Sequence, residues 1–512
     1  MADLGRPIWY AKEVIEISSN ALSRLHLDPA SEVPIYKQLA ESIRALVNHG
    51  TIRAGERLPA TRELAGQLGL NRTTVSAAYS MLEQVGLLEG HVGRGSFIAK
   101  TDRTRSPAAA DWEALLPPLE SIAVPARQIE ISFASSHPAE DAFPLTQFRR
   151  LSKEVIDSAD AAQILQLGSP HGYLPLRRYL LDEAANSGIA RVNDDLLITN
   201  GCQQALDLLA RVFMAGKSDE DRRVVIEDPT YHGLIRVFSR AGAHLVSVPL
   251  DEAGIDLNAL QEVVEQHRPR LLVITPSFQN PTGATLPLER RERLVELAQR
   301  FGLILVENDI YSELRYQGDP LPTLKELDES GNTILLRSYS KVSFPGLRVG
   351  WVIAPRPVIA RLAEAKQVSD LHSDQLSQAV LLRFAESGEL ARHLARTRQE
   401  GARRLQALLR ACARCLPAGT TFTRPEGGMN LWIELPAPLS AEALLNRVEE
   451  RGVNFLPGRY FSIRRAHPRG LRISFGGLSP EQITRGIQIL GEAAALALAD
   501  AAGFREPVAA VV

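Results

Sequence analysis

Apolar residues follow two different spacings along this chain. In the helical stretches between residues 34 and 82 they recur every three or four positions; Ile35, Leu39 and Ile43 form one helical face, which Pro34 begins and Gly50 ends. From residue 129 onward short apolar runs alternate with amphipathic stretches, and these runs are 195–199, 223–226, 271–274 and 303–306. Because strands alternate with helices there, the pattern predicts an α/β domain with a mostly parallel sheet.

The first region contains two further short helices. Thr61 is placed to cap a helix over 61–69, and Asn71 is placed to cap a second helix that runs through Val75, Tyr79 and Leu82. Two helices joined by a tight glycine turn predict a helix-turn-helix. Residues 87–98, with several glycines, predict a β-hairpin wing after it.

The polar residues of this module point to DNA. The second helix would present Arg72, Thr73 and Thr74 at its N-terminal end, where a recognition helix meets bases and phosphates, and Arg94 at the wing tip suits a narrow minor groove. The alternative is a small helical protein-interaction domain with solvated arginines. Segments 34–36, 55–59, 61–65, 72–75, 82–83 and 93–97 closely resemble the GntR-type winged helix. That resemblance implies DNA contacts from Arg62, Arg72, Thr73, Thr74 and Arg94.

Charge supports the same division. Residues 34–100 hold eight basic and five acidic side chains, a net +3, so the rest of the chain, whose total is −2, carries −5. Residues 100–128 are rich in Thr, Ser, Ala and Pro and predict a linker. We therefore expect an N-terminal extension at 1–30, a DNA-binding domain at 31–99, the linker at 100–128 and a larger domain at 129–505.

The larger domain carries a lysine suited to pyridoxal 5'-phosphate. Lys341 lies in the run 338–350 with Ser338, Ser340 and Arg348. A lysine that forms a Schiff base with the cofactor needs hydroxyl groups and an arginine nearby, because the cofactor's phosphate is a dianion. The run therefore predicts Lys341 as the cofactor's covalent attachment point.

Other candidate residues each follow a predicted strand, where ligands gather in α/β sheets. Gly201, Cys202 and Gln203 precede a helix predicted at 205–213 and can offer backbone amides to a phosphate. Tyr231 can stack on the pyridine ring, while Asn280 and Tyr311 suit the cofactor's phenolic oxygen. Taken singly, each motif is also an ordinary turn.

In this order, and ending at 471–476, these motifs resemble the fold-type I aminotransferase family over roughly 370 residues. The resemblance implies that Arg472 binds a substrate or effector carboxylate as a bidentate fork. Both halves together resemble the MocR-type branch of GntR regulators. That branch implies a head-to-tail homodimer that binds double-stranded operator DNA and senses an amine or amino acid.

The sequence departs from the aminotransferase pattern at the residue that faces the nitrogen of the cofactor's pyridine ring. Aminotransferases place an aspartate three residues before the tyrosine, and here that position is Asn308. Asp309 follows, but strand alternation points it to the opposite face unless the chain shifts locally. We expect the neutral amide of Asn308 to face the ring nitrogen, so that the ring withdraws electrons less strongly than in an aminotransferase.

Two further positions depart from the pattern of related proteins. Leu167 stands where many aminotransferases have a tyrosine. Tyr231 is followed by His232 and Gly233, whereas some regulators of this branch have an arginine two residues after this tyrosine; this difference disfavours dicarboxylate or γ-amino acid effectors.

The leading hypothesis is a cytoplasmic transcriptional regulator that senses pyridoxal phosphate, an amino compound or both. The alternative is an active amino acid:2-oxo acid aminotransferase with a DNA-binding appendage, and the sequence leaves retained transamination open. No apolar run reaches membrane-spanning length. Three cysteines are too few for a disulfide framework or a zinc site, so Cys412 and Cys415 are expected on one helix face. His171 and His232 are expected to pack or hydrogen-bond rather than catalyse.

Overall fold

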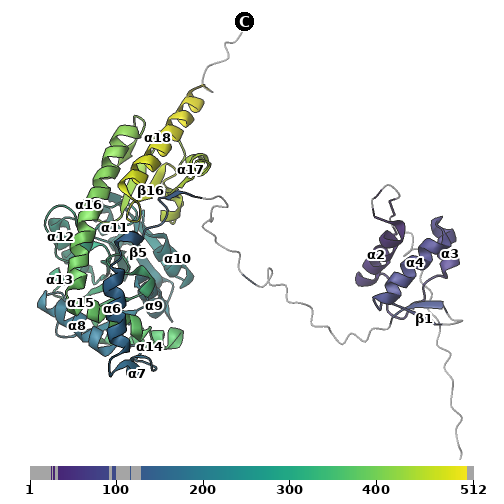
Figure 1. The fold of residues 1–512 in the computed structure, drawn as a ribbon, viewed down its shortest axis with the longest axis horizontal. Helices are drawn as coiled ribbons and strands as arrows, with labels where there is room; N and C mark the ends of the chain where they lie inside the picture. The colour runs from purple at the N-terminus through teal and green to yellow at the C-terminus, as the bar shows by residue number, and fades with distance from the viewer. Residues whose placement is uncertain are drawn as a thin grey trace, which may run out of the picture. The chain divides into compact units, whose positions relative to one another are not determined.

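The structure, a computed structural model, describes residues 33–91, 95–99 and 129–503, together with Leu25, Leu27, Asp28, Ser31 and Leu116. The chain divides into two compact units, residues 1–122 and 123–512 (Figure 1). The division falls within the predicted linker 100–128, of which only Leu116 is described.

The first unit contains three helices and a hairpin in its described part. Its elements are α2 (Ile35–Asn48), α3 (Thr61–Leu68), α4 (Arg72–Gln84), β1 (Leu88–His91) and β2 (Gly95–Ile98). β1 and β2 pair antiparallel, with Leu88 opposite Ile98. Leu39, Ile43, Val75 and Leu82 are buried together, which confirms the predicted apolar face and the helix-turn-helix with its wing.

The two helix starts differ in how they are capped. Asn71 caps α4 as predicted, because its side-chain oxygen accepts a hydrogen bond from the Thr73 backbone amide at 3.1 Å. The prediction that Thr61 caps α3 was wrong. Thr61 is the first helical residue and Ala60 holds the cap position, without a side-chain hydrogen bond.

The second unit is built on a mixed sheet of eight strands in its described part. The strand order is β4-β11-β10-β9-β8-β5-β6-β7, and β11 and β7 run against their neighbours. The strands are β4 (Asp194–Thr199), β5 (Arg223–Asp228), β6 (His244–Asp251), β7 (Gly254–Ile255), β8 (Leu271–Ile274), β9 (Ile304–Asn308), β10 (Thr333–Ser338) and β11 (Gly350–Pro355). The four apolar runs singled out in the sequence therefore form β4, β5, β8 and β9.

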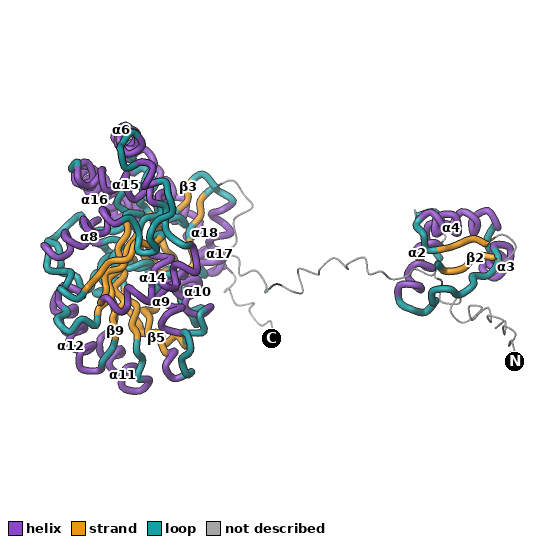
Figure 2. Tube along the Cα trace, turned by 90° about the horizontal axis from the view of Figure 1, so that it is seen from below, coloured by secondary structure: helices purple, strands orange, loops and turns teal. Residues whose placement is uncertain are grey.

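Helices cover both faces of this sheet (Figure 2). One layer contains α9 (Cys202–Met214), α10 (His232–Arg240) and α14 (Arg356–Asp370); the other contains α8 (Leu174–Asn186), α11 (Leu257–His267), α12 (Leu288–Phe301), α13 (Leu324–Leu327) and α15 (Gln375–Glu386). Successive residues of one strand enter opposite layers: Leu197 packs with the first, and Leu196 and Ile198 pack with the second. Two more helices, α6 (Leu145–Ile156) and α7 (Ala161–Ile164), pack beside α15.

The C-terminal part forms a smaller layer with its own core. Its sheet has the order β12-β13-β16-β15, made of β12 (Thr421–Phe422), β13 (Asn430–Glu434), β15 (Leu456–Pro457) and β16 (Gly470–Ser474). A two-stranded parallel sheet joins β3 (Ile131–Ser132) to β14 (Val453–Asn454). The long helices α16 (Glu389–Cys415) and α18 (Pro480–Gly503) lie side by side, with α17 (Ala441–Glu449) beside α18 (Figure 1).

Short 3-10 turns complete the described chain: η1 (Glu140–Ala142), η2 (Glu220–Arg222), η3 (Ser312–Leu314), η4 (Pro345–Leu347) and η5 (Gly458–Phe461). Cys412 and Cys415 both lie on α16 and are free thiols. Among the described residues, no cluster of His, Cys, Asp or Glu has the makings of a metal site. None of the described helices combines the length and apolar character that crossing a bilayer requires.

Candidate functional site

A cavity of about 280 Å³ opens where the strands of the large sheet end. Most of its walls come from the segments that follow β4, β5, β8, β9 and β10. The predicted residues that line it are Cys202, Gln203, Tyr231, Asn280, Asn308, Tyr311, Ser338, Ser340, Lys341, Arg348 and Arg472. Residues separated by as much as 270 positions thus face one space. The other two predicted residues, Gly201 and Asp309, do not line it; Gly201 directly precedes Cys202 in the chain.

One end of the cavity is a helix N-terminus beside an arginine. α9 begins at Cys202, three residues earlier than predicted, and Gly201 holds the cap position with φ +81°. A Cβ at Gly201 would lie 2.5 Å from Arg348 Nη2, so only glycine lets the guanidinium approach this turn so closely. Arg348 donates to Asn200 O at 3.2 Å and to Ser340 Oγ at 3.3 Å. This arrangement suits a phosphate dianion.

An acidic residue behind this turn fixes it in place, and the sequence reading missed it. The Asp370 carboxylate accepts hydrogen bonds from Asn200 Nδ2 (2.9 Å), Gln204 Nε2 (2.7 Å) and Lys366 Nζ (2.8 Å). Asp370 ends α14, so the turn before α9 is tied to a second helix of the same layer. The (i, i+4) spacing of Lys366 and Asp370 predicts their own ion pair, but nothing local predicts the contact with Asn200.

Lys341 lies between β10 and η4, with its side chain in the cavity. Its Nζ donates to the backbone oxygen of Ser136, and Ser338 Oγ and Ser340 Oγ are 2.9 Å apart close by. Ser136 and Ala134 belong to the segment after β3, which folds over the cavity from more than 200 residues away in the sequence. The amine is thus held at the cavity by an acceptor that sequence reasoning did not identify.

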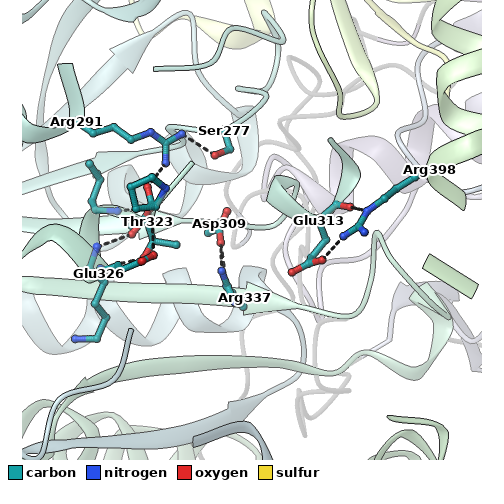
Figure 3. Close-up of polar contacts among 12 residues, drawn as sticks. Ser277, Arg291, Asp309, Glu313, Thr323, Glu326, Arg337 and Arg398 are labelled. Atoms are coloured by element: carbon teal, nitrogen blue, oxygen red, sulfur yellow. Dashed lines mark hydrogen bonds and ion pairs between the residues drawn. The ribbon is translucent and has the colours of Figure 1, made fainter. Parts of the chain in front are cut away.

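Asn308 and Asp309 lie on opposite faces of the strand. Asn308 lines the cavity; its Nδ2 donates to Thr275 Oγ1 at 3.4 Å, and its buried Oδ1 has no partner among the described residues. Asp309 points away and binds Arg337 through Nε (2.9 Å) and Nη2 (2.8 Å), as Figure 3 shows. Of the two arrangements considered for this pair, the structure therefore has the neutral amide in the cavity.

Tyr231, Tyr311 and Asn280 form side walls of the cavity. Tyr231, at the start of α10, donates from Oη to Gln203 Oε1 at 3.2 Å, and burial raises its pKa. Asn280 follows β8 and accepts a hydrogen bond from Arg472 Nη1 at 3.3 Å. Tyr311 is buried, with its Oη 3.5 Å from Asn430 Nδ2. These groups offer an aromatic face and polar atoms to a flat, polar ligand.

Arg472 reaches the cavity from β16 of the smaller layer. Its guanidinium donates to Ala134 O and Asn280 Oδ1, and it lies 5.3 Å from the centre of the Phe461 ring. Burial lowers its pKa to about 10, so the group stays protonated at neutral pH. Its Nε has no partner among the described residues. A buried, incompletely bonded guanidinium of this kind suits a ligand carboxylate.

Three other positions were expected to be packing residues or departures. His232 lines the cavity between Tyr231 and Phe461, and burial, with the charges of Arg472 and Arg236, lowers its pKa to about 4. Its imidazole is therefore neutral at pH 7. His171 does not line the cavity, and Leu167 is 75% exposed and also lies outside the lining.

Four of the five DNA contacts predicted on the first unit are described, and each is at least partly exposed. Arg72 and Thr73 are exposed at the N-terminal end of α4, Thr74 is half-buried beside them, and Arg62 is exposed on α3. Thr73 Oγ1 donates to Asn71 Oδ1 at 3.0 Å, so the capping residue also orients a candidate contact. Arg94 lies outside the described residues. The start of α4 is thus polar and open, as a major-groove reader requires.

The residues of the cavity fit pyridoxal phosphate. A lysine amine can take up an aldehyde, and the start of α9 with Arg348 and Ser340 can take up a phosphate dianion. Four residues that line the cavity have a buried polar atom without a partner among the described residues: Ser136 Oγ, His232 Nδ1, Asn308 Oδ1 and Arg472 Nε. Since buried polar atoms normally find partners, these atoms support a polar ligand in this position.

Comparisons with known proteins agree with both units. Residues 129–490 match the family of class I and II aminotransferases, and residues 35–98 match the gntR family of bacterial regulatory proteins. A probable rhizopine catabolism regulatory protein, MocR, of Rhizobium meliloti is 31% identical, with 92% of this chain and 95% of the relative covered. A 2-aminoadipate transaminase of Thermus thermophilus is 39% identical, with 71% of this chain and 89% of the relative covered.

A solved structure resembles the second unit. LysN, an α-aminoadipate aminotransferase from Thermus thermophilus complexed with N-(5'-phosphopyridoxyl)-L-leucine, is 38% identical with a TM-score of 0.67, covering 72% of this chain and 93% of its own. Pyridoxal phosphate is therefore the cofactor of this chain's fold, in agreement with the cavity. The aminotransferase relative matches only the second unit, whereas the regulator matches nearly the whole length. The chain belongs to the class I and II aminotransferase family through its second unit and, as a whole, to the MocR-type GntR regulators, which join a GntR helix-turn-helix to an aminotransferase-like domain.

Proposed function

We propose that this chain is a transcriptional regulator that binds operator DNA through its first unit and responds, through the cavity of its second unit, to pyridoxal phosphate and an amino compound. One observation carries the proposal: a single chain holds both a helix, α4, whose polar start is exposed, and a cavity lined by Lys341, Arg348 and Arg472. An enzyme alone does not need the first feature, and an ordinary repressor does not need the second.

The proposed cofactor contacts follow the layout of the cavity. Lys341 holds the cofactor covalently; the amides of Gly201, Cys202 and Gln203 bind the phosphate together with Ser338, Ser340 and Arg348. Tyr231 covers one face of the ring, Asn280 and Tyr311 bind its phenolic oxygen, and Asn308 takes the ring nitrogen. When bound, the cofactor supplies an aldehyde that captures primary amines and a ring that withdraws electrons.

The proposed effector is an α-amino acid or a similar amine with one carboxylate. Arg472 binds that carboxylate, because its guanidinium is buried, charged and short of one partner. Neutral His232 and Gly233 follow Tyr231, so this wall offers no second cation to a second carboxylate. An effector with one carboxylate fits this distribution of charge better than a dicarboxylate.

On the DNA side, Arg62 and Arg72 bind phosphates or bases, and Thr73 and Thr74 contact the same groove; Arg94 is proposed as the wing contact. We further propose that the protein acts as a homodimer in the cytoplasm, since a twofold protein reads a palindromic operator with two recognition helices. Effectors change DNA affinity only as far as they favour one of two arrangements of that dimer.

Three measurements on the full-length protein test the proposal. The absorbance of lysine-bound cofactor is expected in the wild type and absent in Lys341→Ala. The loaded protein is expected to select one family of sequences from a random DNA pool. Steady-state turnover with a panel of amino acids is expected to stay far below a typical enzyme's rate of about 10 s⁻¹.

The second candidate function, an active aminotransferase, is favoured by the 39% identity with a transaminase and by Asn280, Tyr311 and Arg472 in the cavity. Turnover in the usual enzyme range, without any selected DNA sequence, would establish it in place of the regulator.

A further inference from the structure

Strand alternation sorts the charged and neutral groups at the end of β9 and β10. Asn308 and Ser338 face the cavity, whereas Asp309 and Arg337, their chain neighbours, face the opposite side. Figure 3 shows Arg337 and Asp309 pointing toward one another. The cavity is therefore lined by the neutral amide of Asn308 and not by the carboxylate of Asp309, the next residue in the chain.

Arg337 holds this carboxylate through one of its two oxygens. Its Nε and Nη2 both bind Asp309 Oδ2, at 2.9 Å and 2.8 Å, while the buried Oδ1 has no partner among the described residues, and the Asp309 side chain is only 1% exposed. A buried carboxylate that lost its cation would be left charged without solvent, so Asp309 cannot turn into the cavity as an ordinary rotamer change. As the paired cation, Arg337 also offsets the negative charge of Asp309 on the far side of the strand.

The other charged groups around the pair come from three neighbouring elements. Glu307, on the same strand, accepts hydrogen bonds from the amides of Leu324 and Lys325 at 2.9 Å and 3.0 Å. Arg291 of α12 is buried and bonded to backbone oxygens and to Ser277 Oγ, and Glu313 of η3 pairs with Arg398 at 2.6 Å. Each of these groups already has partners on the far side, which leaves Asp309 and Arg337 as the pair next to Asn308.

We propose that Arg337 is a positioning residue that keeps Asp309 behind the strand and neutralised, so that the cofactor's ring nitrogen is held by the uncharged Asn308 alone. An adjacent carboxylate stabilises the protonated ring, and protonation is what makes the ring a strong electron sink. Asn308 Oδ1 can accept one hydrogen bond from the ring but supplies no charge. A bound amine is then captured but slowly converted, which suits a sensor. This inference rests on the cofactor binding of the proposed function.

The test uses full-length protein loaded with cofactor labelled with ¹⁵N in the ring, in wild type, Asn308→Asp, Arg337→Gln and the double variant Asp309→Asn/Arg337→Gln. Arg398→Gln, which breaks the nearby pair with Glu313, is the matched control. The readouts are the pH titration of the ring-nitrogen chemical shift and the single-turnover rate at which a bound amino acid passes its amino group to the cofactor.

Asn308→Asp is expected to raise the ring-nitrogen pKa by about one unit or more and to speed conversion about tenfold or more. Arg337→Gln is expected to raise the ring-nitrogen pKa and the conversion rate as well, but by less than Asn308→Asp does. The double variant also removes the charge of Asp309, so its pKa and rate are expected to equal those of the wild type. Arg398→Gln is expected to match wild type.

The outcomes distinguish a failure of this inference from a failure of the proposed function. Loaded, coloured proteins with the same ring titration in Asn308→Asp and wild type would overturn this inference alone. An Arg337→Gln effect that persists in the double variant would overturn the role given to Asp309. If Arg337→Gln does not fold, the double variant, which has neither charge, gives the answer. A ring-nitrogen pKa below that of the wild type would contradict the proposal, and a ring-nitrogen pKa equal to that of the wild type would support it. A wild type that never binds cofactor would instead overturn the proposed function.

Discussion

Asn200 and Asp370 are 170 positions apart in the sequence and are joined by a hydrogen bond of 2.9 Å from Nδ2 to Oδ2. Asn200 immediately precedes the glycine that caps α9, and Asp370 ends α14. The same carboxylate also binds Gln204 and Lys366. The proposed phosphate site therefore depends on a residue that never touches the ligand.

Replacing Asp370 with Asn should weaken cofactor binding. One oxygen becomes an amide nitrogen, which must then face either Lys366 or the two amide donors, so one arm of the network is lost. The loss is expected to be about 1 kcal/mol, or roughly five- to tenfold in the dissociation constant for pyridoxal phosphate, measured by absorbance titration. Glu364→Gln, on the exposed side of α14, is the control and should bind cofactor normally. Equal affinities for wild type and Asp370→Asn would show that the turn is held without this carboxylate.

Arg472→Lys should separate effector binding from cofactor binding. Lysine keeps the charge but loses the planar fork, so amino acids are expected to bind about tenfold or more weakly, while cofactor absorbance is retained. A primary amine that has no carboxylate should bind both proteins alike. Arg469→Lys, a half-exposed neighbour paired with Glu434, is the matched control. If Arg472→Lys weakened binding of the simple amine as much as binding of the amino acid, Arg472 would not act through the ligand's carboxylate.

On the first unit, Arg72→Ala should weaken operator binding by roughly 1 to 3 kcal/mol if the side chain reads a base. A comparison of the selected operator with a scrambled site measures this: a base contact is lost only on the operator, whereas a phosphate contact is lost on both. Arg44→Ala, exposed on α2 and paired with Glu41, is the control. Unchanged operator affinity in Arg72→Ala would remove the start of α4 from the interface.

Glu227 predicts a pH dependence of stability. Burial raises its pKa to about 8, although the Thr275 amide and Gln279 donate to its carboxylate. The folded chain therefore keeps a proton that the unfolded chain releases above its ordinary pKa of 4.5, and the stability from this group falls as pH rises from about 4.5 to about 8.

In urea unfolding from pH 5 to 8.5, wild type should lose stability relative to Glu227→Gln by up to a few kcal/mol across that window. Glu307, whose pKa burial also raises, is present in both proteins, so the difference between them isolates Glu227. Parallel curves for the two proteins would show that Glu227 is ionised in the fold throughout.

Local patterns were sufficient for much of the fold. The β4, β5, β8 and β9 runs are short and apolar because both sheet faces are covered, so they stand out without knowledge of their partners. Helix ends were less certain: Thr61 is an ordinary capping residue by type, yet Ala60 occupies the cap, and α9 begins at Cys202 because Gly201 can adopt a positive φ.

Long-range contacts were beyond the sequence. Ser136 meets Lys341 across 205 positions and Asp370 meets Asn200 across 170, and neither contact leaves a periodic or motif-like trace. The opposite directions of Asn308 and Asp309 were predictable from strand alternation, but Arg337, which fixes Asp309, was not, because it lies on a different strand. His232 was expected to be a packing residue, and it does pack, while also lining the cavity.

The central claim is that the occupant of the cavity sets the affinity for DNA. The most direct measurement is the operator dissociation constant, at one fixed salt concentration, for the full-length protein without cofactor, with pyridoxal phosphate, and with pyridoxal phosphate plus an amino acid, alongside Lys341→Ala in the same three conditions. We expect the operator dissociation constants of the three wild-type states to differ about fivefold or more, and the constant of Lys341→Ala not to change with cofactor. Identical operator affinity in all three wild-type states would contradict it.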